Sequence, residues 1–224
     1  MHAADVIATR LFEAGVRHAF GIPGGEVLTL VDALERAGIR FHLTRHENAA
    51  GFMAEGAWHA SGAPGLLVAT VGPGIANALN VVENARQDRV PLIVISGMVD
   101  PAEAMSYTHQ VFDHGAVLSR ITKASFRVPD GAADVTVAKA LRIALSGRPG
   151  PVHLDLPIAV AAAGQDAPRA RPHLPALPSA PWGEGVETAR ARFAAAERPL
   201  ILAGLDVINE PGGPSALRAF AERH

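Results

Sequence analysis

The sequence predicts an α/β fold: a doubly wound domain with a parallel sheet, followed by the start of a second α/β unit. Over about the first 160 residues, short apolar runs alternate with segments whose apolar residues recur at helical spacing. The runs are apolar throughout, as in strands that are buried on both faces of a parallel sheet. Loops rich in glycine and proline follow several of these runs, which is typical of turns from a strand into a helix.

Each element has its own local signal. Val6, Ile7 and Leu11 lie on one helical face, and Gly15 suits the end of that helix. Pro91 opens an apolar run at the first position of a strand, where a missing N–H group is tolerated. The predicted helices cover residues 4–14, 25–37, 46–61, 74–87 and 132–146. The predicted strands cover residues 18–22, 39–43, 66–71, 91–96, 125–128 and 150–157.

The composition changes after the last of these strands. We expect the first domain to span residues 1–162, and a linker rich in proline and alanine to span residues 163–182. Residues 183–224 predict a helix over 184–197, a strand over 199–204 and a helix over 214–223. Some 40 residues are too few to bury a full core. We therefore expect this segment to be the incomplete start of a second domain.

Charge and composition argue against several classes of function. The 224 residues carry 20 basic and 22 acidic side chains, so no basic surface for nucleic acid is expected. The absence of cysteine excludes disulfides and thiolate metal sites. No apolar run approaches the ~20 residues that cross a bilayer, and the first residues lack the features of a signal peptide. The sequence thus predicts a cytoplasmic protein with no nucleic-acid or membrane partner.

Glu47 is the most informative residue, because it stands where an apolar strand gives way to a helix. One interpretation is a capping box, with Thr44 as the N-cap and Glu47 at position N3, and the spacing alone favours it. The other is an acid in a cleft, where burial disfavours the charged form and the acid can share a proton with a ligand. Residues 21–25, 71–74 and 96–100 follow other strands, so all these segments are expected at one edge of the sheet.

Two other motifs are incomplete. His46 and Glu47 lack the second histidine of the H-E-x-x-H zinc motif, so we predict no metal site there. Residues 21–25 lack the full G-x-G-x-x-G spacing of a dinucleotide loop, although a Rossmann-type nucleotide binder stays open as an alternative.

A set of short segments in a fixed order carries a family resemblance. These segments are residues 21–25, 45–47, 54–57, 72–77, 91–97, 121–123 and 146–152. Over about residues 4–160, the sequence resembles the N-terminal, pyrimidine-binding domain of thiamine-diphosphate enzymes of the acetolactate synthase type. Residues 183–224 resemble the start of the central domain of that family.

The resemblance implies roles for individual residues. Glu47 would be catalytic: it would hydrogen-bond the aminopyrimidine of the cofactor and stabilise its imino tautomer, which prepares the cofactor to attack a 2-oxo acid. The implied cofactor-binding residues are Pro23, Gly24, Glu47, Pro73 and Asn77. The implied substrate-facing residues are Gly25, His109, Gln110 and Lys123.

Some of these assignments have alternatives. Acetolactate synthases typically have an aromatic residue before the glutamine that matches Gln110 and an acid after it, whereas this chain has His109 and Val111, which leaves the substrate open. His109 and His114 could contact an acidic substrate or be loop histidines. Lys123 could lie near the substrate entrance or be a solvated lysine.

The resemblance also implies what lies outside the chain. Family members hold the diphosphate through Mg²⁺ on a C-terminal domain marked by Gly-Asp-Gly, which does not occur in this sequence. The implied assembly is a homodimer or homotetramer, or a complex with a separate diphosphate-binding subunit, and the chain alone is predicted to be inactive. Whether the central domain binds FAD stays open. The implied reaction is carboligation from a small-molecule 2-oxo acid; a simple 2-oxo acid decarboxylase and a non-catalytic remnant are the alternatives.

Overall fold

The computed structural model describes residues 1–100, 102–107, 110–166, 183–210 and 212–223. The chain divides into two compact units, Met1–Pro175 and Ala176–His224, which are described separately. Residues 163–166 belong with the first unit, since Gly164 forms an antiparallel bridge to His2. The predicted linker otherwise covers residues 167–182, which lie outside the described residues.

The first unit is built on a six-stranded sheet in which every pairing is parallel, as predicted. Its strand order is β2-β1-β3-β4-β6-β5. The chain leaves β1 for β2 on one side and then returns to place β3 on the other side of β1. This reversal makes the carboxyl edge between β1 and β3 a switch point, where ligands bind in such sheets. The strands are β1 His18–Gly21, β2 Arg40–Leu43, β3 Gly65–Ala69, β4 Leu92–Met98, β5 Ala124–Arg127 and β6 Val152–Pro157.

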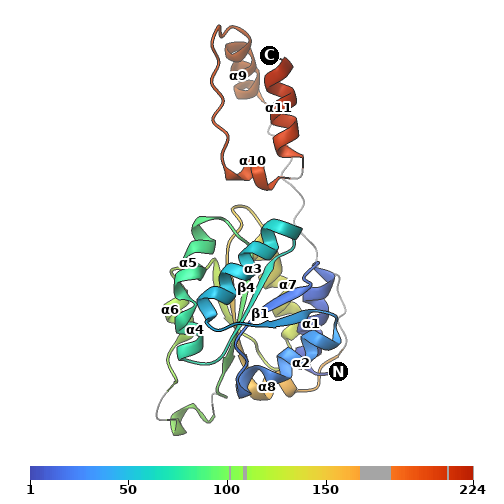
Figure 1. Cartoon of the computed structure of the whole chain (residues 1–224), viewed down its shortest axis with the longest axis vertical. Coiled ribbons are helices and arrows are strands. Elements are labelled where there is room, and N and C mark those ends of the chain that lie inside the picture. The colour runs from blue at the N-terminus through green and yellow to red at the C-terminus, as the bar shows by residue number, and fades with distance from the viewer. Residues whose placement is uncertain (101, 108–109, 167–182, 211, 224) are drawn as a thin grey trace. The chain divides into compact units, whose positions relative to one another are not determined.

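Helices cover both faces of the sheet (Figure 1). Along β3, Leu66 and Val68 face one apolar cluster, and Leu67 and Ala69 face the other. This is why the strand is apolar throughout. The first cluster includes residues from α1 Ala3–Glu13, α2 Leu28–Arg36, α7 Ala133–Leu145 and α8 Ile158–Ala162. The second includes residues from α3 Glu47–Ser61, α4 Pro73–Asn77, α5 Leu79–Gln87 and α6 His114–Leu118.

Several short elements were not predicted. The single helix expected over 74–87 is two helices, α4 and α5, which meet at Ala78. The helices α6 and α8 have five residues each, too few for a periodic pattern to be visible in the sequence. Two 3-10 turns, η1 Gly25–Val27 and η2 Ala104–Ser106, follow β1 and β4.

The second unit contains α9 Glu184–Ala194, α10 Leu205–Asn209 and α11 Gly213–Arg223. The rings of Phe193 and Phe220 lie 5.1 Å apart and join α9 to α11. The strand predicted over 199–204 is wrong: these residues form no strand or helix, and Leu200 and Leu202 are 84% and 89% exposed. A strand needs a partner, and the described part of this unit offers none. Across the described residues of both units, no helix combines the length and apolarity that a membrane span requires.

Candidate active site

Three loops meet at the carboxyl edge of β2, β1 and β3. The loop after β1 contains Gly24, and the loop after β3 leads into α4, whose second residue is Gly74. A Cβ atom on Gly24 would lie 2.6 Å from Thr70 Cγ2, and one on Gly74 would lie 2.2 Å from Thr70 Oγ1. Both glycines therefore pack against Thr70 at distances that only glycine permits. Thr70 was not among the predicted site residues, although it directly follows the apolar run of β3.

Glu47 is the first residue of α3, so the alternative of a capping box, with Thr44 as the N-cap and Glu47 at position N3, is wrong. His46 is the N-cap, and its Nδ1 accepts the backbone N–H of Asn48 at 3.1 Å. The Thr44 hydroxyl donates instead to the carbonyl oxygens of Gly21 and His46, each at 3.2 Å. Because another residue caps the helix, the Glu47 side chain is available for a different role.

The Glu47 carboxylate is buried at this edge and only partly satisfied. The residue is 6% exposed, and the side-chain amide of Asn77 donates to its Oε2 at 3.1 Å. Its Oε1 lies beside Gly74, at 3.4 Å from the position a Cβ would take there. Within the described part of the chain, Asn77 is the one hydrogen-bond partner of this carboxylate. Oε1 is not among the described side-chain atoms that are both sealed from the surface and without a partner, so a ligand at this edge can reach it.

This arrangement fits the pyrimidine end of thiamine diphosphate. A protonated carboxyl oxygen can donate to a ring nitrogen, and the bare Cα of Gly74 leaves that oxygen uncovered. Gly25, at the start of η1, has nothing within 4 Å of a built Cβ, so the space beside the loop is open. Pro23 lies in the loop after β1, two residues before η1, and Pro73 is the first residue of α4.

The expected substrate residues are not all brought together. Gln110 lies at this edge: it has φ +67°, and a Cβ on Gly72 would lie 2.3 Å from its carbonyl oxygen. Gly25 lies there too, whereas His109 is outside the described residues.

The structure does not bring Lys123 to the edge at which Glu47 lies. Lys123 precedes β5, so it lies at the amino edge of the parallel sheet, opposite to Glu47. Its ammonium donates to the carbonyl oxygens of Ile143 and Ser146, the latter at 2.6 Å. Lys123 therefore satisfies the C-terminal carbonyls of α7, as a cation does at a helix C-terminus.

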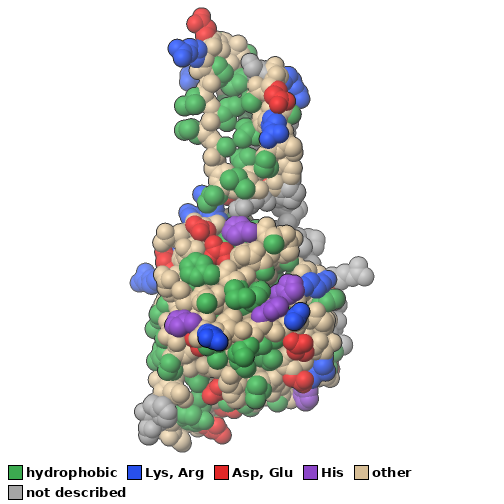
Figure 2. Space-filling model, viewed as in Figure 1, with side chains coloured by type: hydrophobic (Ala, Val, Ile, Leu, Met, Phe, Trp, Pro, Cys, Tyr) green, Lys and Arg blue, Asp and Glu red, His purple; other side chains and the backbone are tan. Residues whose placement is uncertain are grey.

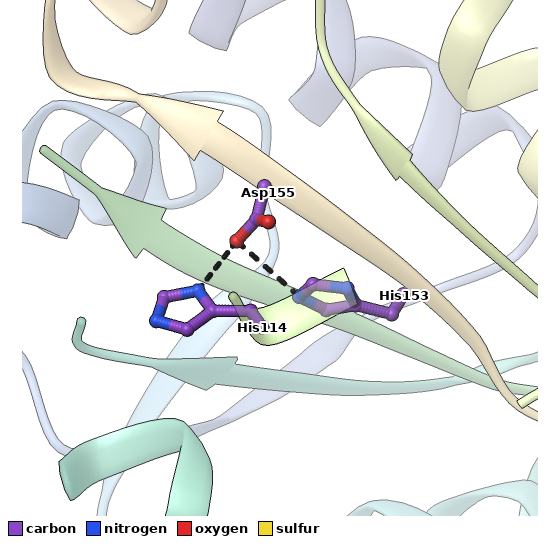
Figure 3. Close-up of side chains that lie close together, drawn as sticks. All are labelled: His114, His153 and Asp155. Carbon is purple, nitrogen blue, oxygen red and sulfur yellow. Dashed lines mark hydrogen bonds and ion pairs between the residues drawn. The ribbon is translucent and has the colours of Figure 1, made fainter. Parts of the chain in front are cut away.

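A second polar cluster lies between the sheet and α6 (Figure 3). We call it the histidine network; it consists of Ser96, His114, Ser125, His153 and Asp155. His114, at the start of α6, and Asp155 are joined at 2.7 Å between Nδ1 and Oδ1. Ligand atoms of His114, His153 and Asp155 lie within 4.8 Å of one another, so among the described residues this is the group that could hold a metal ion.

Burial dominates the electrostatics of the network. It lowers the pKa of His153 to about 4, so this imidazole is neutral at pH 7. Burial also acts to raise the pKa of Asp155, but the hydrogen bonds from His114 and Ser96 help to outweigh it, so the pKa of Asp155 lies below its ordinary value.

The sequence contains part of the signal for the histidine network, although no motif includes it and the order of the strands is also needed. Ser96, Ser125, His153 and Asp155 are polar residues inside apolar strands. Ser96 pairs with Asp155 in the register of β4 and β6, and Ser125 pairs with His153 in the register of β5 and β6. Polar residues at matching positions of three adjacent strands predict one buried cluster.

A family model matches the first half of the chain. Residues 1–117 match a family model described as "Thiamine pyrophosphate enzyme, N-terminal TPP binding domain". TPP, thiamine pyrophosphate, is another name for thiamine diphosphate.

The curated relatives match along nearly the whole chain. The "Acetolactate synthase isozyme 1 large subunit" of Escherichia coli is 35% identical over 98% of this chain and 39% of its own length. The "Acetolactate synthase large subunit" of Lactococcus lactis is 34% identical over 99% of the chain and 39% of its own length. The "Probable 2-ketoarginine decarboxylase AruI" of Pseudomonas aeruginosa is 36% identical over 99% of the chain and 40% of its own length.

The chain thus spans about two fifths of the length of these relatives. Its parallel sheet, the buried glutamate at the start of α3 and the family match over residues 1–117 lead to one conclusion. The chain belongs to the thiamine pyrophosphate enzymes and carries their N-terminal, TPP-binding domain.

Proposed function

We propose that this chain is the pyrimidine-binding part of an acetolactate synthase-like enzyme, which decarboxylates a 2-oxo acid and transfers the two-carbon remainder to an acceptor. The observation that carries the proposal is the Glu47 carboxylate, buried at the switch-point edge with Asn77 as its partner on Oε2. The similarity to acetolactate synthases over nearly the whole chain supports the choice of reaction.

The residues of the chain have separate roles in this proposal. Glu47 holds a proton at Oε1 and shares it with a nitrogen of the aminopyrimidine ring. Asn77 fixes the carboxyl group by donating to Oε2 at 3.1 Å. Gly24 and Gly74 let the ring approach the backbone, since neither has a Cβ. Pro23 and Pro73 line the ring, and Gly25 and Gln110 face the substrate. Thiamine diphosphate, when bound, supplies the electron sink for the decarboxylation.

The proposal assigns the diphosphate to residues outside this chain. We propose that Mg²⁺ and a diphosphate-binding domain hold that end of the cofactor. FAD, if bound, would belong to the central domain whose start the resemblance places at residue 183.

We further propose that a second copy, or a separate subunit, covers the face on which α3 lies. Figure 2 shows hydrophobic side chains on this face of the first unit. Phe52 and Met53, on the helix that begins with Glu47, are 43% and 46% exposed, and Leu43 is 72% exposed. Exposed apolar residues gathered beside a site are typical of an interaction surface.

The test is a hybrid enzyme in which this chain replaces the aligned N-terminal residues of the E. coli isozyme 1 large subunit. With pyruvate, thiamine diphosphate and Mg²⁺, we expect the hybrid to form acetolactate. Glu47→Gln should lower its rate about 10²–10⁴-fold, as expected for the loss of a positioned proton donor. Glu55→Gln is the matched control, because Glu55 is on the same helix but accepts from Asn84 at 3.1 Å, away from the loops.

The outcomes separate the alternatives. Full activity of the Glu47→Gln hybrid would contradict the role of Glu47. An active parent hybrid that forms aldehyde without acetolactate would favour the second candidate, a 2-oxo acid decarboxylase. The 36% identity to the 2-ketoarginine decarboxylase supports that candidate. Lack of activity in a folded hybrid that binds the cofactor would favour a non-catalytic remnant.

A further inference from the structure

The histidine network is connected to the cofactor loop by one hydrogen bond. His114 Nε2 accepts the backbone N–H of Gly72 at 3.1 Å, and both residues are buried. Gly72 is the N-cap of α4, directly before Pro73, and has φ +62°. A side chain at Gly72 would also meet the backbone of Gln110 at 2.3 Å. The position of this amide therefore fixes the turn that carries Pro73 and Gly74.

The donors and acceptors of the network can be assigned in only one way. Asp155 is a carboxylate, which only accepts, so the Ser96 hydroxyl donates to its Oδ1 at 2.7 Å. Ser96 must then accept from His153 Nε2, also at 2.7 Å. His153 Nδ1 is left without a proton and accepts from the Ser125 hydroxyl at 2.7 Å. The proton of His153 is therefore on Nε2.

His114 has the opposite tautomer. Its Nε2 accepts from Gly72, so the ring is neutral and its proton is on Nδ1, which donates to Asp155 Oδ1 at 2.7 Å. A continuous chain of hydrogen bonds thus runs from Ser125 through His153, Ser96, Asp155 and His114 to the amide of Gly72. Each imidazole uses both of its nitrogens.

The separations fit hydrogen bonds better than metal coordination. Nitrogen and oxygen ligands at about 2.0 Å from a tetrahedral Zn²⁺ lie about 3.3 Å from each other. Here His114 Nδ1 and Asp155 Oδ1 are 2.7 Å apart, a separation typical of a shared proton. A cavity of about 380 Å³ is lined by both residues, so an added ion could reach them and the two possibilities can be tested against each other.

We propose that His114 is a positioning residue: with the histidine network behind it, it holds the Gly72 amide and so fixes the turn through Gly74 beside Glu47. The consequence for the cofactor rests on the proposed function. The hydrogen-bond chain itself does not, and it can be tested in this 224-residue chain without cofactor.

The first measurement is the tautomeric state of the two imidazoles, read from ¹⁵N chemical shifts at pH 7. We expect a neutral ring with the proton on Nδ1 for His114 and a neutral ring with the proton on Nε2 for His153. The same tautomer in both rings, or a charged His114, would overturn the proposal. So would Zn²⁺ binding that is stoichiometric, shifts both rings and is lost in His153→Gln.

The second measurement is hydrogen exchange of the Gly72 amide in two matched variants. His114→Asn keeps a donor near the position of Nδ1 but has no acceptor at the position of Nε2, whereas His114→Gln can place its oxygen there. We expect exchange at Gly72 to become about tenfold faster in His114→Asn, the size of effect that one lost hydrogen bond gives, and to be largely restored in His114→Gln. Exchange at Leu67, in the centre of β3, reports global stability and should change equally in both variants.

A Gly72 amide that exchanges at the same rate in His114→Asn as in the parent chain, relative to Leu67, would contradict the proposal. If the proposed function also holds, His114→Asn in the hybrid enzyme should raise the KM for thiamine diphosphate more than it lowers kcat, and His114→Gln should recover it. An inactive hybrid would count against the proposed function alone, because the exchange and tautomer results do not depend on activity.

Discussion

Glu47 and Asp155 are two buried carboxylates on the same face of the same sheet, and they differ in what surrounds them. Asp155 accepts from Ser96 and His114 and belongs to a chain in which each imidazole uses both nitrogens. Glu47 has one neutral partner, Asn77, on one oxygen. The difference indicates two roles: the Asp155 carboxylate, held on Oδ1 by two donors of the fold, supports the structure, and the Glu47 carboxylate, held by one neutral donor, is kept for a ligand. Substitutions that conserve shape can measure this difference.

The largest expected effect comes from removing Asp155. Asp155→Ala leaves the Ser96 hydroxyl and the His114 Nδ1–H buried without an acceptor, which should reduce the free energy of unfolding by about 3–5 kcal/mol. Asp155→Asn keeps one acceptor oxygen and should cost clearly less. Urea unfolding of the whole chain, followed by circular dichroism, measures both. Equal, small losses for the two variants would show that the network adds little stability.

The next effect is a dependence of stability on pH through His153. The pKa of His153 is about 4 in the folded chain, below its ordinary value of 6.5, because burial disfavours the charged imidazole. Between pH 6.5 and pH 4, the imidazole of residue 153 is protonated in the unfolded chain but neutral in the folded chain. Stability is therefore full above pH 6.5 and falls by about 3 kcal/mol as the pH drops towards 4. Unfolding midpoints in urea from pH 7 to pH 4 measure it. His153→Gln should flatten the slope in that range, and an unchanged slope would contradict the assignment.

An intermediate effect concerns the space beside Glu47. Gly74→Ala would place a methyl group 2.2 Å from Thr70 Oγ1 and 3.4 Å from Glu47 Oε1, and should reduce stability by about 1–3 kcal/mol. Gly25→Ala is the matched control, since nothing lies within 4 Å of its Cβ, and its stability should be close to that of the parent. Calorimetric unfolding of the two variants compares them. Similar stability of both would show that Thr70 moves aside without cost.

The smallest effect is expected for the carboxylate that we assign to the ligand. Glu47→Gln keeps the shape of a side chain that has a single neutral partner in the fold, so the free energy of unfolding should change by less than about 1 kcal/mol. The same urea experiment measures it beside Asp155→Asn. A loss for Glu47→Gln that equals or exceeds the loss for Asp155→Asn would remove the distinction between the two carboxylates.

The fold followed from the sequence because most of its signals are local. Apolar runs such as 66–71 predicted buried parallel strands, and the positions of Gly24, Glu47 and Gly74 after successive strands predicted a shared edge. The capping box failed because Thr44 and Glu47 have the correct spacing, but His46 reaches the Asn48 amide first. Spacing does not say which of two polar residues becomes the cap.

The parts of the site that the sequence did not place have a different physical origin. Lys123 matched a motif, but its ammonium group donates hydrogen bonds to carbonyl oxygens at the C-terminus of α7. These contacts join residues that are 20 or more positions apart in the sequence. The histidine network depends on the order β4-β6-β5, in which β6 lies between two strands that precede it in the chain. That order cannot be read from periodicity, which describes each strand by itself.

The contact between Gly72 and Gln110 has a consequence for divergence within such enzymes. The loop that would select the substrate rests on the turn that would hold the coenzyme, with no room between their backbones for even one methyl group. A change that reshapes residue 110 to admit a new oxo acid will therefore also displace the turn. New substrate preferences should arise through paired substitutions in both loops, and libraries that randomise them together should yield active variants more often than libraries confined to either one.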